Sequence, residues 1–310
     1  MKKVFIDGEA GTTGLRIRQR LAARTDIALV TLPEDLRKDA DARKAALNAA
    51  DIAFLCLPDA AAVEAVAMID NPDTVVLDTS TAHRTDPRFV YGFPELSAVQ
   101  AEKIAASRRI AVPGCHASGF IATVAPLVRA GLLSPEAMLT CHSVTGYSGG
   151  GKKMIAAYSE PARSPLYDAP RQYGLSQTHK HLPEMAAMCG LQNAPVFCPI
   201  VADFYSGMVV TVPLFSAQLM HGATAADVRA VLSEAYGGPV VRYVDTADAD
   251  GFLSAAALSG KDAMEIAVFG NETRLLLTAR YDNLGKGASG AAVECMNLVL
   301  GVDATTGLDL

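Results

Sequence analysis

Gly8-Glu9-Ala10-Gly11-Thr12-Thr13-Gly14 follows the short apolar stretch Val4-Phe5-Ile6 and precedes a run over residues 13–23 that is typical of a helix. A glycine-rich turn between a strand and a helix gathers backbone amides at the positive end of the helix dipole, where a pyrophosphate can bind. The spacing G-x-x-G-x-x-G departs from the commoner G-x-G-x-x-G, and such glycines can also serve turn geometry alone. We favour dinucleotide binding, with Gly8, Gly11, Thr12, Thr13 and Gly14 at the cofactor.

The residues around this loop predict a doubly wound sheet. Strands are expected at 27–32, 51–57 and 74–78, with a helix at 59–69. Nearly continuous apolar strands are typical of a sheet covered on both faces. The first part is therefore expected to be a Rossmann-type parallel sheet in an α/β protein.

The pattern changes after Gly114. Strands are expected at 139–144, 196–201, 208–215, 264–269 and 273–281, and helices near 178–188, 224–236 and 289–300. Strands so close in sequence favour a mostly antiparallel sheet, and hence an α+β catalytic domain. We place the boundary so that residues 1–114 form the first domain and residues 115–282 the second.

Composition excludes several classes of protein. The 310 residues are half apolar, enough for two cores, and the net charge of -6 includes no basic stripe, so no nucleic-acid partner is expected. The six cysteines include no C-x-x-C pair, which predicts no metal site and a reducing, cytoplasmic setting. We expect no signal peptide and no membrane span, because no stretch offers about 18 consecutive apolar residues.

Cys115 is the candidate nucleophile. It follows Val112-Pro113-Gly114 in a tight turn before an apolar helical run over 120–133. Helix N-terminal amides favour thiolate over thiol, so a cysteine there can be reactive at neutral pH. The alternative is a small buried hydrophobic residue, as most free cysteines are.

Three further segments offer polar side chains. His179 and His181 flank a helix start and could exchange protons, although capping or surface histidines are the alternative, and His-x-His without a third ligand is weak evidence for metal. Tyr147, Ser148 and Gly149 belong to a loop over 146–153 that could hold a substrate phosphate or carboxylate, or could be merely flexible. Arg84 could pair with a substrate anion or with a surface carboxylate.

The cofactor stays open on residues alone. Glu34 and Asp35 lie where an acid would hold a ribose hydroxyl of NAD, whereas Arg37 and Lys38 could hold the 2′-phosphate of NADP.

Four motifs in order resemble the N-acetyl-γ-glutamyl-phosphate reductases of arginine biosynthesis, in their shorter branch. They are Pro113-Gly114-Cys115, the 146–152 loop, the 179–184 segment and Asp282-Asn283-Leu284-Gly285-Lys286-Gly287-Ala288-Ser289-Gly290. His116 departs from the pattern, since the longer branch usually has an aromatic residue there. The alternatives are a related semialdehyde dehydrogenase acting on another acyl phosphate, such as aspartyl phosphate, or a non-catalytic dinucleotide sensor.

The resemblance implies NADPH-dependent reduction of N-acetyl-glutamyl 5-phosphate to the semialdehyde through a thioester on Cys115. It implies a histidine as general acid/base but does not separate His179 from His181. We choose His181 for that role, with His179, Ser143 and Tyr173 placing the substrate, and the resemblance favours NADP. It also implies that a C-terminal helix within 283–310 completes the cofactor domain, and that the protein is a homodimer or homotetramer. The remaining residues expected at the cofactor are Pro58, Ser80, Asn283, Gly285 and Lys286.

Overall fold

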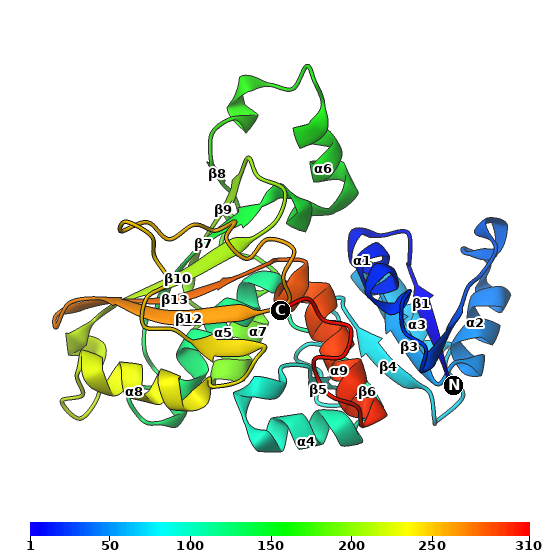
Figure 1. Ribbon diagram of the computed structural model, residues 1–310, viewed down its shortest axis with the longest axis horizontal. Coiled ribbons are helices and arrows are strands. Elements are labelled where there is room, and N and C mark those ends of the chain that lie inside the picture. The colour runs from blue at the N-terminus through cyan, green and yellow to red at the C-terminus, as the bar shows by residue number, and fades with distance from the viewer. The chain divides into compact units, whose positions relative to one another are not determined.

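The computed structural model describes residues 1–310, which divide into two compact units (Figure 1). The first unit comprises Met1–Pro94, Ala98–Gly114 and Ala288–Leu308, and the second comprises Glu95–Ser97, Cys115–Gly287 and Asp309–Leu310. The chain thus passes from the first unit to the second between Gly114 and Cys115. The segment 283–287 lies in the second unit, and 288–308 lies in the first.

The first unit is built on a six-stranded sheet in the order β2-β1-β3-β4-β6-β5, with every pair parallel. Its strands are β1 (Lys2–Asp7), β2 (Ile27–Val30), β3 (Ile52–Leu55), β4 (Val75–Asp78), β5 (Val90–Tyr91) and β6 (Arg109–Ala111). Its helices are α1 (Thr12–Leu21), α2 (Ala40–Ala49), α3 (Asp59–Ala67), α4 (Ala98–Ala106) and α9 (Gly290–Leu300). The predicted doubly wound parallel sheet is confirmed.

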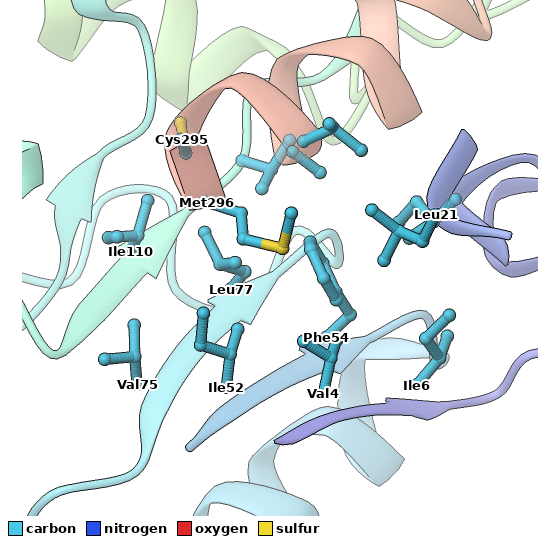
Figure 2. Close-up of a cluster of buried hydrophobic side chains, with 14 of the residues drawn as sticks. Val4, Ile6, Leu21, Ile52, Phe54, Val75, Leu77, Ile110, Cys295 and Met296 are labelled. Atoms are coloured by element: carbon cyan, nitrogen blue, oxygen red, sulfur yellow. The ribbon is translucent and has the colours of Figure 1, made fainter. Parts of the chain in front are cut away.

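Successive side chains of β1 point to opposite faces of this sheet and pack in the cores on both sides. Val4 and Ile6 join a core with residues of α1 and α9, including Leu21 and Met296 (Figure 2). Phe5 points to the opposite face and packs with Leu47 of α2. Helix α2 was not expected from the sequence; the Asp39 side chain caps it by accepting a hydrogen bond from Ala42 N at 2.8 Å.

The second unit contains a seven-stranded sheet in the order β11-β12-β13-β10-β7-β9-β8. Its strands are β7 (Thr140–Gly146), β8 (Arg171–Gln172), β9 (Val196–Ala202), β10 (Met208–Phe215), β11 (Val241–Tyr243), β12 (Met264–Gly270) and β13 (Arg274–Tyr281). The pairs β7–β9 and β11–β12 are parallel and the others antiparallel, so the expectation of a mostly antiparallel sheet is confirmed.

Helices cover one face of the second sheet. Helix α5 (Cys115–Arg129) packs on β10 and β13, α7 (Leu182–Cys189) packs on α5, and α8 (Ala225–Ala235) packs on β11 and β12. The remaining helix, α6 (Gly151–Ser159), follows β7 and a short helical turn at Tyr147–Gly150. No helix in the protein combines the length and the apolar character that crossing a membrane requires.

Candidate active site

Cys115 is the first residue of α5 and is partly exposed. The Tyr281 hydroxyl donates to the Cys115 carbonyl and accepts from Gly119 N at 3.0 Å, which fixes the first turn of the helix. Gly287 lies so close that a Cβ there would be 3.0 Å from the Cys115 Cβ. A fixed cysteine at a helix N-terminus is suited to act as a nucleophile.

A cluster of rings lies next to this cysteine. His116 is buried; its Nδ1 lies 2.7 Å from Ser143 Oγ and its Nε2 lies 2.7 Å from the Tyr173 hydroxyl. Its ring centroid is 5.7 Å from that of His179 and 5.6 Å from that of His181. Burial, followed by the positive charge of His179, lowers the pKa of His116 to about 3, so the ring is neutral.

His179 and His181 lie against one another with centroids 4.7 Å apart. His181 precedes α7 as its cap residue, and its backbone N donates to His179 Nδ1 at 3.2 Å. Ser143, Tyr173, His179 and His181 were expected at the site from the family resemblance, and the second unit brings all four around His116. The sequence left the role of His116 itself undefined, although its position directly after the cysteine was a usable signal.

The 146–150 segment is held by hydrogen bonds rather than open. Ser148 Oγ accepts from Asn283 Nδ2 at 3.0 Å, and Asn283 Oδ1 accepts from Gly207 N at 2.9 Å. A Cβ at Gly149 would lie 3.3 Å from Asn283 Nδ2, and Tyr147 stacks on Tyr158 with centroids 4.6 Å apart. The two glycine-rich segments of the second unit therefore meet at Asn283.

Lys286 is almost fully buried. Its Nζ lies 2.7 Å from both carboxylate oxygens of Glu95, and a Cβ at the neighbouring Gly285 would overlap the Lys261 carbonyl. Charge neutralisation of this kind stabilises a buried ammonium. A direct contact of Lys286 or Gly285 with cofactor stays a prediction.

The glycine loop of the first unit has the geometry of a phosphate site. Gly8 has φ 85°, and a Cβ there would overlap the Cys56 carbonyl; a Cβ at Gly14 would lie 2.6 Å from Gly8 O. Only glycine satisfies both restrictions. Gly11 caps α1 without a side-chain hydrogen bond, which leaves the first amides, at Thr12 and Thr13, open to an anion.

A pocket of about 560 Å³ adjoins this loop. Its polar lining comes from the end of β1, the glycine loop, the segment after β2 and α2: Asp7, Glu9, Glu34, Asp35, Arg37, Lys38 and Arg43. Arg37 lies 2.8 Å from Glu9, whose carboxylate also lies 3.1 Å from Arg18, and Arg43 lies 2.9 Å from Asp7. Both candidate cofactor determinants, the acids and the cations, thus line one pocket, together with Glu9 and Arg43, which the sequence did not single out.

Three other expected residues lie at the ends of β3, β4 and β6. Pro58 precedes α3, and Ser80 Oγ donates to Asp78 at 2.7 Å. The buried Arg84 guanidinium donates to the carbonyls of Val112 at 2.9 Å and Thr79 at 3.0 Å. In this structure Arg84 therefore stabilises the end of β6, from which the chain continues to Cys115. No group of three or more His, Cys, Asp or Glu side chains is arranged to hold a metal ion.

The chain is similar to known proteins along nearly its whole length. A family model described as "Semialdehyde dehydrogenase, dimerisation domain" matches residues 115–283, and one described as "Semialdehyde dehydrogenase, NAD binding domain" matches residues 30–105. The N-acetyl-gamma-glutamyl-phosphate reductase of Rhizobium etli (strain CIAT 652) is 47% identical over 305 residues, which cover 96% of this chain and 98% of that protein. The chain belongs to the N-acetyl-gamma-glutamyl-phosphate reductase family. The reductase of Brucella ovis is likewise 47% identical, over 307 residues that cover 96% of this chain and 99% of that protein.

Solved structures agree on the fold. Aspartate semialdehyde dehydrogenase II from Vibrio cholerae has a TM-score of 0.73 at 15% identity, covering 97% of this chain and 98% of that one. Aspartate semialdehyde dehydrogenase from Candida albicans has a TM-score of 0.67 at 14% identity, covering 97% of this chain and 99% of that one. The resemblance drawn from the four motifs is thus confirmed, and the protein is a nicotinamide-dependent oxidoreductase of this family.

Proposed function

We propose that the protein reduces N-acetyl-glutamyl 5-phosphate to N-acetyl-glutamate 5-semialdehyde and phosphate in arginine biosynthesis, with NADPH as cofactor. The observation that carries the proposal is the identity of 47% over 96% of the chain to reductases with this name. Support from the site comes from Cys115 at a helix N-terminus beside His179, His181 and Tyr173.

The first unit is suited to the cofactor. The open amides at the start of α1 suit a pyrophosphate, and Arg37 and Lys38 in the adjoining pocket suit a 2′-phosphate. When bound, NADPH supplies the hydride. We assign Gly8, Gly11 and Gly14 the task of letting the backbone approach the phosphates.

The second unit carries the covalent chemistry. The Cys115 thiolate attacks the acyl carbon, and the carbon–oxygen bond to phosphate breaks with its electron pair leaving on phosphate. Reduction of the resulting thioester leaves a negative charge on the acyl oxygen, and protonation by the general acid gives a thiohemiacetal. The same group takes this proton back as the carbon–sulfur bond breaks with its electron pair leaving on the Cys115 sulfur and the aldehyde departs. We assign that proton to His181, and substrate placement to His179 and to the 147–149 segment.

The reverse assay tests this function. N-acetyl-glutamate 5-semialdehyde, phosphate and NADP are mixed with the protein, and NADPH absorbance is followed. We expect turnover that is absent from Cys115→Ser and much weaker with aspartate semialdehyde. Preferred turnover of aspartate semialdehyde would assign the protein to a related dehydrogenase, and no turnover of any semialdehyde would favour a dinucleotide sensor.

A second copy of this chain is the proposed partner, in a homodimer or homotetramer. Support comes from the match to a dimerisation domain and from the sheet face opposite α5, where Phe215 and Leu276 are 64% and 42% exposed. Analytical ultracentrifugation tests it, because a monomer at micromolar concentration contradicts the proposal. Six free cysteines support a reducing compartment, so we place the enzyme in the cytoplasm.

A further inference from the structure

His116 lies next to the nucleophile, yet the chemistry described above assigns it no task. The bonds of its two ring nitrogens link Ser143 of β7, His116 of α5 and Tyr173, which directly follows β8, into one hydrogen-bonded chain. The direction in which these hydrogen bonds run decides whether Ser143 or Tyr173 has a hydroxyl hydrogen left to donate.

The chain has two possible directions. His116 is buried and neutral, and a neutral imidazole has one N–H donor and one nitrogen that accepts. Either Ser143 donates to Nδ1 while Nε2 donates to Tyr173, or Tyr173 donates to Nε2 while Nδ1 donates to Ser143.

Ser143 selects the first direction. Its side chain is completely buried, and the bond to His116 is the one hydrogen bond that its hydroxyl makes. If Nδ1 carried the proton, the hydroxyl hydrogen of Ser143 would be buried without an acceptor, which costs about 1–3 kcal/mol. Ser143 therefore donates to Nδ1, and Nε2 carries the proton and donates to the Tyr173 oxygen.

Tyr173 consequently keeps its own hydrogen. Its hydroxyl makes no second hydrogen bond within the protein, and it stays protonated because burial, and then the negative charge of Cys115, raise its pKa. The hydroxyl thus has a free hydrogen-bond donor 2.7 Å from the ring of His116, the residue that directly follows the nucleophile in α5.

We propose that Tyr173 donates a hydrogen bond to the oxyanion formed when Cys115 attacks an acyl carbon, and that His116 and Ser143 are positioning residues that direct this donor. As the sulfur–carbon bond forms, the carbonyl π electrons move to oxygen, and Tyr173 stabilises that charge without releasing its proton. When the pair returns, the leaving group departs with the electrons of its bond to carbon. Only the identity of the acyl group rests on the proposed function.

Acylation by p-nitrophenyl acetate isolates this step, because it needs neither cofactor nor physiological substrate. The thiolate displaces p-nitrophenolate through the same kind of oxyanion, and the burst is read by absorbance. Loss of one oxyanion donor slows such a step by about 10²–10³-fold, which is the expectation for Tyr173→Phe. His116→Phe should lose on the order of 10-fold, since the hydroxyl remains but is no longer directed.

The double variant His116→Phe/Tyr173→Phe separates positioning from general structural damage. If both residues act through one donor, it should be no slower than Tyr173→Phe alone. Tyr243→Phe is the matched control, because Tyr243 lies on β11, at the opposite edge of the sheet from β8. It should leave the burst unchanged, and Cys115→Ser should abolish it.

Three outcomes of these experiments would overturn the proposal. A wild-type burst rate in Tyr173→Phe, losses that multiply in the double variant, or no burst from the wild type would each contradict it. Ser143→Ala provides a second route should His116→Phe fail to fold, since it removes one buried oxygen and should slow the burst by a few-fold while Tyr173 is intact. A wild-type burst without turnover of N-acetyl-glutamate 5-semialdehyde would refute the proposed function and leave this inference standing.

Discussion

Replacing Arg37 and Lys38 together by alanine should reduce the preference for NADPH over NADH. Both residues line the pocket beside the phosphate loop, where the Arg37 side chain is 38% exposed and its guanidinium lies 2.8 Å from Glu9. A charge-assisted hydrogen bond contributes about 1.5–3 kcal/mol, and partial exposure places this one near the lower end. Since about 1.4 kcal/mol corresponds to tenfold in affinity, we expect NADPH to bind at least about 10-fold more weakly.

NADH binding should change little, because NADH has no 2′-phosphate. Dissociation constants for both cofactors can be measured from cofactor fluorescence, as the chain contains no tryptophan, and kcat/KM ratios provide the parallel kinetic measure. Glu34→Gln serves as the matched control on the same pocket and should not weaken NADPH binding. An unchanged NADPH/NADH ratio in the double variant would refute the reasoning and move the phosphate site to Thr12 and Thr13, whereas wild-type preference for NADH would show that an acid holds the ribose.

Cys115→Ser should lose several powers of ten in turnover while NADPH affinity in a fluorescence titration stays within about twofold, because the nucleophile is not part of the glycine loop. His181→Asn should lower kcat by about 10²–10⁴-fold, while His179→Asn should act mainly on KM; the reverse outcome in steady-state kinetics would exchange their roles. Stability should fall below pH 6.5, since the unfolded chain then binds a proton that the buried His116, with a pKa of about 3, does not. Urea unfolding at pH 6.5 and pH 5 should show a loss of about 2 kcal/mol from this residue, and an identical pH dependence in His116→Phe would refute that source.

The parts predictable from sequence are those set by local sterics and periodicity. Gly8 and Gly14 indicated a phosphate turn, and the structure shows why no side chain fits at either position. Helix α2 was missed because its small and charged residues show no strong apolar periodicity, although Asp39 offered a capping signal. The parallel pairing of β7 with β9 was missed because the two strands come together across a long intervening segment.

The sequence named candidate site residues but not the hydrogen-bonded network that joins them. The motifs identified Cys115, His179 and His181, whereas the partners of His116 lie 27 and 57 positions away along the chain. No local pattern specifies contacts at such separations. Likewise Glu9, which was read only as a loop residue, turns out to pair with Arg37 because the segment after β2 returns to the loop.

The burial of the His116 ring has a consequence for the fidelity of the enzyme. Water can hydrolyse a thioester, and each hydrolysis would release the acyl group as a carboxylic acid before it is reduced. His116 packs against Phe197 with centroids 5.3 Å apart, and the ring centroids of His179 and His181 lie 5.7 and 5.6 Å from its own. We expect these rings to limit the access of water to an acyl group on Cys115 from that side. Removing one of these rings, for example by Phe197→Ala, should therefore raise the fraction of N-acetyl-glutamate among the products.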